Sequence, residues 1–310
     1  MSAQHRVAVV QAASTPFRAE PAVDKALQLI AKAGAEGAKL ALFPEAFVGG
    51  YPKGSTFATP VGTRLPGARD SFLRYFNGAI EVPGVETARI AQAAAEAGVF
   101  TVIGVIERGG ATLYCTALFF DPKLGLVGKH RKLMPTAAER VIWGFGDGST
   151  LTAVDSAVGR VGSVICWENY MPMLRMAMYA KGVQIYCAPT ADDRDTWVPT
   201  MRHIAIEGRC FVLSACQHIR RAAYPDDYDC LLGNAPETLL MRGGSLIVGP
   251  LGEVLAGPNY EGEAILYADI DLDDVARGKF DLDVVGHYAR PDVFRLEVDT
   301  AEKPAVRSAG

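Results

Sequence analysis

Short apolar runs alternate with segments of helical periodicity along most of the chain. Short continuous or alternating apolar runs are typical of buried strands, whereas apolar residues spaced three or four apart are typical of amphipathic helices. Strands are predicted at residues 6–12, 40–43, 101–107, 114–121, 160–166, 183–187, 211–216, 245–248, 254–255 and 264–269. Helices are predicted at residues 21–35, 84–97, 171–181, 195–208 and 272–278.

The order of these elements predicts an α/β layered fold. Alternating strands and helices pack helices against sheets, with many of the strands buried on both faces. The strands at 101–107 and 114–121 look like an antiparallel pair, which argues against a purely parallel sheet. Residues 48–83 are rich in Gly, Pro and aromatic residues and are predicted to form a long loop, and an irregular, charged tail follows residue 278.

The composition is that of an ordinary globular protein, with 49% apolar and 21% charged residues. At 310 residues the chain can form one large core or two small ones, and no repeat or composition break marks a linker. A net charge of −4 lacks the basic field that nucleic acid or an anionic membrane surface requires. No stretch approaches the roughly 20 apolar residues of a membrane span, and the N-terminal apolar run is too short for a signal peptide. We therefore expect a cytoplasmic protein that binds neither nucleic acid nor membranes.

The six cysteines are widely spaced and form no CxxC pair, so we expect buried thiols rather than disulfides. No His/Cys spacing resembles a zinc site, and no dinucleotide or phosphate-loop motif is present. The glycine-rich run at residues 144–148 lacks the lysine and hydroxyl residue of a phosphate loop. The sequence therefore predicts neither a cofactor nor a metal.

One cysteine stands where a strand meets a helix. The run RVGSVIC ends at Cys166, and Trp167–Tyr170 lead into a helix with Pro172 in its first turn, a favoured position. Backbone N–H groups and the positive end of a helix at such a turn can lower the pKa of a thiol and bind an oxyanion. The competing interpretation is a buried structural cysteine, since free cysteines are among the most buried residues.

Two further segments place suitable partners on loops. Glu45 follows a predicted strand end, and the basic run at residues 129–136 precedes Glu139. Each alone is compatible with a solvated surface charge. Together with Cys166 they supply a nucleophile, a general base and a positive charge for an anionic intermediate. Three histidines are alternative bases for a Cys–His pair, although no motif supports them: His203, His218 and His287.

These segments resemble the Glu-Lys-Cys set of the nitrilase, or carbon–nitrogen hydrolase, superfamily. The resemblance rests on Phe43–Phe47, Lys129–Glu139 and Cys166–Asn169. Finer features resemble the nitrilase branch, namely residues 50–54, 131–136, 166–175, 188–192 and 201–210.

The resemblance implies a role for each matching residue. Cys166 would attack a nitrile carbon to give a thioimidate, and Glu45 would activate first the thiol and then water. Lys132 would stabilise the tetrahedral intermediate. Glu139 would position the substrate or complete the proton relay.

The resemblance also implies a four-layer αββα sandwich. It would form one domain over residues 1–292, followed by a tail at 293–310, and it would pair with a second copy into a homodimer. Microbial nitrilases often carry a long extension after the segment at 287–292, whereas this chain ends 18 residues beyond Asp292. A dimer is therefore expected more than a long filament.

Aromatic residues in the loops around this set could border an apolar pocket for an uncharged nitrile. The residues expected to bind substrate are Tyr51, Trp143, Trp167, Thr190 and Trp197. Core packing is the competing interpretation for each aromatic side chain. Aliphatic, aromatic and arylacetonitrile substrates stay open at this point. An amidase or carbamoylase, a nitrile-hydrating enzyme that releases amide, and a catalytically silent scaffold are the alternatives.

Overall fold

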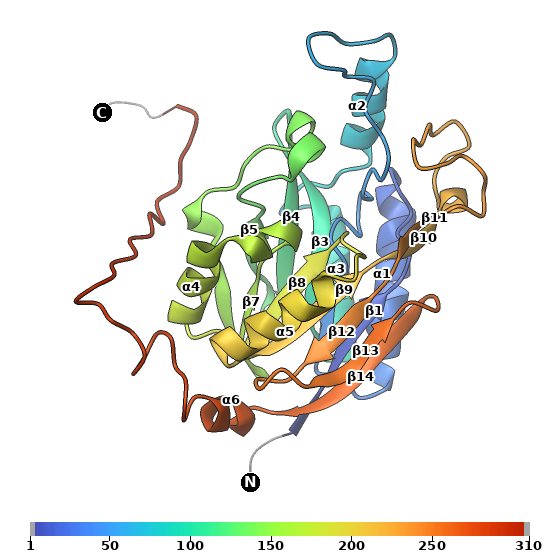
Figure 1. Cartoon of the computed structure of the whole chain (residues 1–310). Helices are drawn as coiled ribbons and strands as arrows, with labels where there is room; N and C mark the ends of the chain where they lie inside the picture. Colours follow the sequence, from blue (N-terminus) through green and yellow to red (C-terminus); the bar gives the residue numbers. More distant parts are fainter. Residues whose placement is uncertain (1–3, 307–310) are drawn as a thin grey trace.

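The computed structural model describes residues 4–306 and contains two six-stranded sheets (Figure 1). The first sheet has the order β14 (Ala264–Asp271), β1 (Gln4–Gln11), β2 (Leu40–Leu42), β3 (Phe100–Gly109), β4 (Thr112–Asp121) and β5 (Gly125–Arg131). The second has the order β13 (Val254–Asn259), β12 (Ser245–Val248), β9 (Phe211–Cys216), β8 (Ile185–Thr190), β7 (Gly159–Ser163) and β6 (Ala153–Ser156). A separate hairpin joins β10 (His218–Arg220) to β11 (Leu239–Arg242).

Parallel strands form the centre of each sheet, and antiparallel strands flank them. β1, β2 and β3 pair in parallel in the first sheet, as do β7, β8 and β9 in the second. β14, β4 and β5 extend the first sheet in antiparallel pairs, so the mixed sheet predicted from the sequence is confirmed. Because parallel strands end at the same edge, the loops that follow them meet there.

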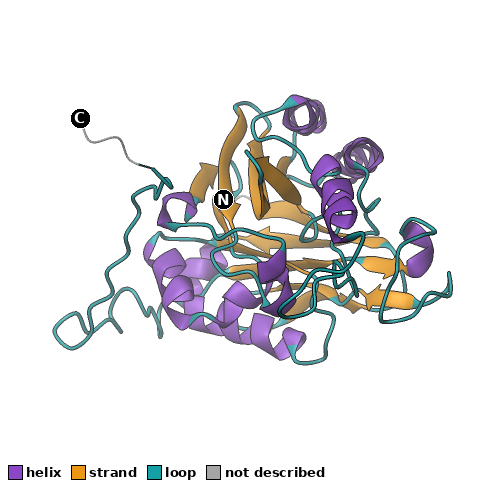
Figure 2. Cartoon of the chain, turned by 90° about the horizontal axis from the view of Figure 1, so that it is seen from above, coloured by secondary structure: helices purple, strands orange, loops and turns teal. Residues whose placement is uncertain are grey.

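The helices cover the outer faces of the sheets (Figure 2). The helices are α1 (Ala19–Ala35), α2 (Ala68–Asn77), α3 (Val85–Ala97), α4 (Pro172–Ala180), α5 (Trp197–Gly208) and α6 (Asp273–Gly278). Alternate residues of a strand point to opposite faces. Val7 and Val9 of β1 therefore pack between the sheets, whereas Ala8 and Val10 pack against α1 and α3. In β9, Val212 packs with α4 and α5. This arrangement confirms the four-layer αββα sandwich.

The loop predicted at residues 48–83 contains a helix, α2, so that part of the prediction is wrong. Gly67 precedes α2 and Gly78 follows it, and such flanking glycines hide a short helix from a pattern-based prediction. Its Tyr75 is fully buried and donates a hydrogen bond to the Gly50 carbonyl oxygen at 3.0 Å. Tertiary contacts of this kind stabilise the helix.

The basic run at 129–136 begins on strand β5 and not on a loop, which corrects a second prediction. Lys129 and Arg131 point to one side of β5 and contact the buried carboxylate of Glu107 at 2.6 and 2.7 Å. His130 and Lys132 are both buried. The buried carboxylate of Glu107 therefore compensates the positive charges of Lys129 and Arg131, which the sequence pattern suggests are solvated.

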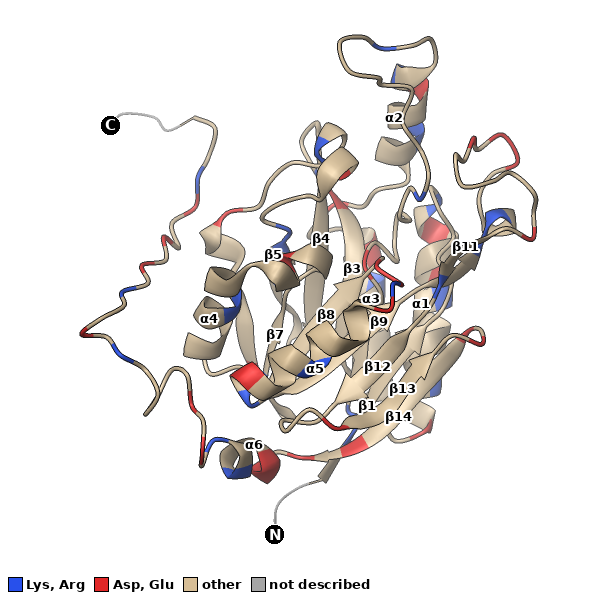
Figure 3. Cartoon of the chain, viewed as in Figure 1, with Lys and Arg blue, Asp and Glu red and all other residues tan. Residues whose placement is uncertain are grey.

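The segment after α6 forms no helix or strand up to residue 306, as expected for the tail. It runs along the outside of the molecule (Figure 1) and carries charges of both signs (Figure 3). The Lys303 backbone N–H donates to the Asp147 carboxylate at 2.8 Å, which holds this segment against the body of the protein. None of the helices within residues 4–306 has both the length and the apolar character that a membrane crossing needs.

The packing between the sheets predicts a large effect of Phe119→Ala. Phe119 is fully buried in this layer, so its truncation should lower the free energy of unfolding by about 3–5 kcal/mol. Urea unfolding measures the loss. Phe280→Ala is the matched control, because Phe280 is 89% exposed and should change stability by less than about 0.5 kcal/mol. Equal effects of the two substitutions would contradict this assignment of the core.

Candidate active site

Glu45 is fully buried in a tight turn after β2. The turn lies against Gly104 of β3, where a Cβ atom would come within 2.3 Å of the Pro44 carbonyl oxygen. Only glycine therefore lets the two backbones approach so closely. The Gln217 side-chain amide donates to the Glu45 carbonyl oxygen at 3.1 Å and holds the turn from the other side. The position of Glu45 is thus set by backbone packing.

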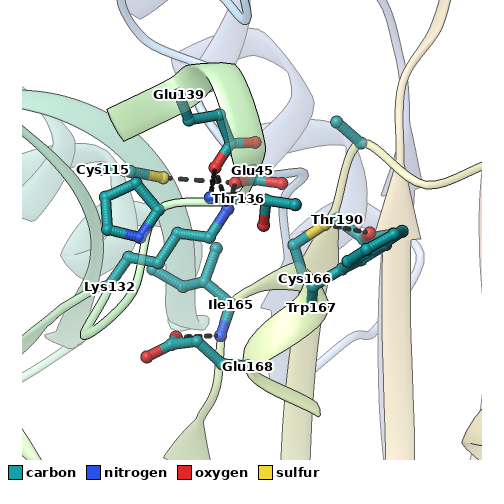
Figure 4. A network of polar contacts seen from close by, with 12 residues as sticks. Glu45, Cys115, Lys132, Thr136, Glu139, Ile165, Cys166, Trp167, Glu168 and Thr190 are labelled. Atoms are coloured by element: carbon teal, nitrogen blue, oxygen red, sulfur yellow. Dashed lines mark hydrogen bonds and ion pairs between the residues drawn. The ribbon is translucent and has the colours of Figure 1, made fainter. Parts of the chain in front are cut away.

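Lys132 follows β5 and lies between two carboxylates (Figure 4). Its Nζ is 2.7 Å from Glu45 Oε1 and 2.8 Å from Glu139 Oε2, and the lysine side chain has no exposed surface. Burial by itself would lower the pKa of Lys132, but the Glu45 and Glu139 charges outweigh it and raise the pKa well above its usual value. The side chain is therefore a permanent buried cation.

Glu139 lies in the short 3₁₀ helix η1 (Ala137–Val141) and caps its start. Its Oε2 accepts the Thr136 backbone N–H at 2.6 Å, and its Oε1 accepts the Tyr51 hydroxyl at 2.6 Å. Together with the Lys132 contact, these bonds hold the carboxylate in one orientation. Glu139 therefore connects the lysine to the wall formed by Tyr51.

Cys166 begins the 3₁₀ helix η3 (Cys166–Tyr170) at the strand-to-helix turn that the sequence predicts. Strand β7 ends three residues earlier, at Ser163. The Cys166 backbone has a φ of +54°, a conformation that non-glycine residues rarely adopt. The Asn169 side chain donates to the Cys166 carbonyl oxygen at 2.7 Å, and the Thr190 hydroxyl donates to Cys166 Sγ at 3.1 Å. These bonds stabilise a backbone that aims the sulfur at the site.

The pKa of the Cys166 thiol is raised, whereas the sequence predicts a lowered one, so this prediction is wrong. Burial is the main cause and the negative charge of Glu45 adds to it, and together they outweigh the opposing effects of Lys132 and Thr190. The resting side chain is a protonated thiol that needs a base. Glu45 Oε2 is buried and has no hydrogen-bond partner within the described residues, and its carboxylate interacts with the thiol. An unpartnered carboxylate oxygen beside a thiol is chemically able to accept its proton.

A second thiol contacts the same carboxylate. Cys115 of β4 is buried and donates to Glu45 Oε1 at 3.4 Å. Sequence reasoning missed this residue, because no motif marks it and only strand pairing places it beside Glu45.

A cavity of about 280 Å³ opens onto Cys166. Its lining residues are Tyr51, Lys53, Thr136, Glu139, Cys166, Trp167, Ala191, Asp192, Asp193 and Arg194. A larger, mainly apolar space of about 620 Å³ adjoins it and shares Tyr51, Lys53, Thr136 and Glu139. Both aromatic and charged groups therefore border the thiol.

Of the five residues expected to bind substrate, three lie at the cavity or contact the sulfur, and two lie elsewhere. Tyr51 and Trp167 line the cavity, and Thr190 contacts the sulfur from behind. Trp143 is buried beside Lys132, with its ring centre 5.4 Å from Nζ, and does not line the cavity. Trp197 is the first residue of α5 and packs into the core between the helices and the second sheet, where its ring N–H donates to Ser214 at 2.9 Å. For these two tryptophans core packing was the better interpretation.

The side chain of Trp167 is held by the loop after β8. Its ring N–H donates to Asp192 Oδ2 at 2.8 Å, and the Arg194 guanidinium lies 4.7 Å from the ring centre. Asp192 in turn pairs with Arg194. This trio fixes one wall of the cavity.

None of the three candidate histidines lines the cavity at Cys166. His203, for example, lies on α5 and contacts Glu207 at 3.1 Å. The Cys–His alternative therefore has no support from the geometry. Among residues 4–306, no group of three or more His, Cys, Asp or Glu side chains could hold a metal ion.

Comparison with known proteins agrees with this fold and identifies the family. Residues 6–280 match the carbon–nitrogen hydrolase family. The chain is 65% identical over 302 residues to a nitrilase of Bradyrhizobium diazoefficiens, with 97% of this chain and 94% of that protein covered. It is 54% identical over 304 residues to a bifunctional nitrilase/nitrile hydratase of Nicotiana tabacum, with 96% and 87% covered. The crystal structure of a carbon–nitrogen hydrolase from Helicobacter pylori G27 has the same fold, with a TM-score of 0.72, 20% identity, and 94% and 97% covered.

The chain therefore belongs to the carbon–nitrogen hydrolase family. Within that family its similarity to nitrilases confirms the branch that the sequence motifs indicated.

The close packing of Gly104 predicts that Gly104→Ala lowers kcat at least about 10-fold while the protein stays folded. The added methyl group displaces the Pro44–Glu45 turn, and a displaced base removes a proton less efficiently. Steady-state kinetics and circular dichroism measure the two effects. Gly262→Ala is the control, since a Cβ there meets no atom within 4 Å. An unchanged kcat in Gly104→Ala would contradict the constraint.

Burial and the neighbouring Glu139 charge raise the pKa of Glu45, despite the opposing effect of Lys132. A base acts in its ionised form, so kcat/KM should fall as the pH drops through this raised pKa. The acid limb, measured with an uncharged substrate, is expected above pH 4.5, the ordinary value for glutamate. An acid limb at or below pH 4.5 would contradict the role of Glu45 as the base.

Proposed function

We propose that the protein hydrolyses an organic nitrile to the carboxylic acid and ammonia, with Cys166 as nucleophile and Glu45 as general base. The observation that carries the proposal is the Glu45–Lys132 contact at 2.7 Å beside a protonated, buried thiol. A carboxylate that removes a proton and a cation that stabilises the resulting negative charge are what a thiol needs to attack a nitrile carbon.

The first half of the reaction joins substrate and enzyme. Cys166 Sγ attacks the nitrile carbon, one carbon–nitrogen π bond breaks, and the thiol proton passes through Glu45 to the nitrogen. The product is a thioimidate. Lys132 stabilises the negative charge that develops, because its ammonium is already desolvated and oriented toward the site. Glu139 holds the lysine in this orientation.

The second half consumes two molecules of water. Glu45 removes a proton from the first water as it adds to the thioimidate carbon, and the tetrahedral intermediate expels ammonia to leave a thioester. The second water adds in the same way, the carbon–sulfur bond breaks, and the acid leaves. Glu45 returns the proton to the Cys166 thiolate and so restores the thiol. The sum is one nitrile and two waters converted to one acid and one ammonia.

Release of amide is a second outcome of the same intermediate. If the carbon–sulfur bond breaks before the carbon–nitrogen bond, one water is consumed and the amide leaves. The plant relative whose name includes nitrile hydratase supports this branch as a side reaction. The ratio of acid to amide then depends on how Lys132 and Glu139 stabilise the two leaving groups.

The cavity walls support an apolar nitrile as substrate. Tyr51 and Trp167 line the cavity that opens onto the thiol, and the adjoining space of about 620 Å³ is lined mainly by apolar surface. We assign this space to the organic group of the nitrile.

We also propose that the chain associates with a second copy of itself. Met173 of α4 and Ile206 of α5 leave apolar side chains on the outer helical layer, 73% and 38% exposed. Such surface supports an interface between copies. Sedimentation that yields the monomer mass at micromolar concentration would overturn this assignment.

A panel of nitriles and their matching amides tests the function. Acid and ammonia from a nitrile, with the amide largely untouched, are the expected result, and they are followed by chromatography and ammonia release. Turnover of amides alone would overturn the nitrilase assignment and indicate an amidase or carbamoylase. No turnover of either, by a folded protein, would favour a scaffold.

Cys166→Ala and Lys132→Met should each lower kcat at least about 1000-fold, since each removes a group that acts in the covalent step. Cys210→Ala is the matched control, because Cys210 is a buried thiol in the core beneath α5. Full activity in Cys166→Ala would rule out the thiol as nucleophile.

A further inference from the structure

Glu168 is a buried carboxylate that the reaction steps above do not use. It lies in η3, two residues after Cys166, and has 1% of its surface exposed. Three donors surround it. Its Oε2 accepts the Ile165 backbone N–H at 2.9 Å (Figure 4). Its Oε1 accepts the Leu133 backbone N–H at 2.7 Å, and Oε2 also contacts His130 Nε2 at 3.0 Å.

The two backbone donors are the neighbours of the reactive residues. Leu133 follows Lys132 and extends from the first sheet, whereas Ile165 precedes Cys166 and extends from the second. One carboxylate therefore joins the backbone beside the cation to the backbone beside the nucleophile. A shift of either segment would stretch one of these two bonds.

His130 contacts this carboxylate and orients it. Its Nδ1 lies 3.0 Å from the Thr150 carbonyl oxygen and its Nε2 lies 3.0 Å from Glu168 Oε2. A carbonyl oxygen can only accept, and an ionised carboxylate that already binds two N–H groups can only accept as well. With an ionised carboxylate at Nε2, both ring nitrogens donate and the ring is an imidazolium, which agrees with the raised pKa of His130.

The surroundings agree with a charged pair. Burial by itself would lower the pKa of His130, but Glu168 outweighs it and raises the pKa above its usual value. The phenol of Tyr186 on β8 also interacts with Glu168, and burial raises its pKa well above its usual value, so it stays neutral. Neither side chain of the His130–Glu168 pair has exposed surface.

Stability alone is a weak reason for this arrangement. A buried ion pair contributes little net stability compared with apolar residues of the same size, because both charges must be desolvated. Here all the bonds of Glu168 converge on the segments that carry Lys132 and Cys166. Removal of the charge should therefore change the geometry of the site.

We propose that Glu168, ionised and oriented by His130, is a positioning residue that sets the distance between the Lys132 ammonium and the Cys166 sulfur. The proposal builds on the proposed function, in which these two groups act together. It assigns no contact between Glu168 and the substrate. A misplacement of about 1 Å can cost about 100-fold in rate, so a small shift is enough.

Glu168→Gln tests the proposal. An amide has one oxygen and one NH₂ group, so whichever way it lies, its NH₂ group faces a backbone N–H and one of the two bridging bonds is lost. We expect kcat to fall at least 10-fold while KM changes less than threefold, because the substrate contacts are intact. Glu107→Gln is the matched control. Glu107 is equally buried and also has three partner residues, but these are the side chains of Thr116, Lys129 and Arg131, and the last two lie on the side of β5 away from His130.

Thermal unfolding separates positioning from stability. Both glutamine variants should lower the melting temperature, but only Glu168→Gln should lower kcat of the folded enzyme. A kcat within threefold of the parent in Glu168→Gln, or an equal loss of kcat in Glu107→Gln, would overturn the proposal.

Two substitutions of His130 test the same bridge when Glu168→Gln fails to fold. In His130→Gln the side-chain amide can donate to Glu168 in place of Nε2, whereas in His130→Asn it can reach only the Thr150 carbonyl oxygen. We expect His130→Gln to retain kcat within threefold of the parent and His130→Asn to lose at least 10-fold. Equal kcat values for the two variants would overturn the role of the His130–Glu168 bond.

The rate of Cys166 alkylation by iodoacetamide, followed by mass spectrometry, needs no substrate. It should fall in Glu168→Gln and His130→Asn and stay unchanged in Glu107→Gln, because proton removal from the thiol depends on the same geometry. A parent protein that turns over no nitrile would overturn the proposed function and leave this comparison intact. Unchanged alkylation in all variants would overturn the positioning role.

Discussion

The ammonium of Lys132, buried between the carboxylates of Glu45 and Glu139, is the interaction on which the site depends. Desolvation of an isolated ion costs several kcal/mol, so three charges stay buried only while they compensate each other at contact distance. The turn after β2, the end of β5 and the helix η1 must therefore keep their relative positions. Gly104, the Thr136 backbone and Tyr51 supply the contacts that hold them.

The reactive groups come from both sheets of the sandwich. Glu45 and Lys132 extend from the first sheet, and Cys166 and Thr190 from the second, so the site exists only when the inner faces of the sheets are packed. The apolar layer between the sheets is thus part of the catalytic apparatus. The proposed Glu168 bridge adds a polar connection between the two sheets at the same place.

Burial also determines the protonation state of the nucleophile. A thiol in contact with a carboxylate and removed from water keeps its proton, although a lysine cation lies nearby. Glu45 Oε2, which has no hydrogen-bond partner within the described residues, can then accept the thiol proton when the substrate binds. In the proposed reaction Glu45 therefore removes the proton from the thiol as the substrate is attacked.

The sequence by itself determined the mixed sheets and most helices, because these depend on local periodicity. Motifs of adjacent residues also indicated Glu45, Lys132 and Cys166, which the structure brings together at one cavity edge. The sequence also indicated Tyr51 and Trp167, which border the cavity. Only the tertiary structure showed that Trp143 and Trp197 are packing residues, that α2 and β5 are regular elements, and that Cys115 and His130 surround the site. It likewise reversed the expected pKa shift of Cys166. The physical reason is common to all of these: burial and cross-sheet contacts decide the charge and orientation of a side chain, and they join residues far apart in the sequence.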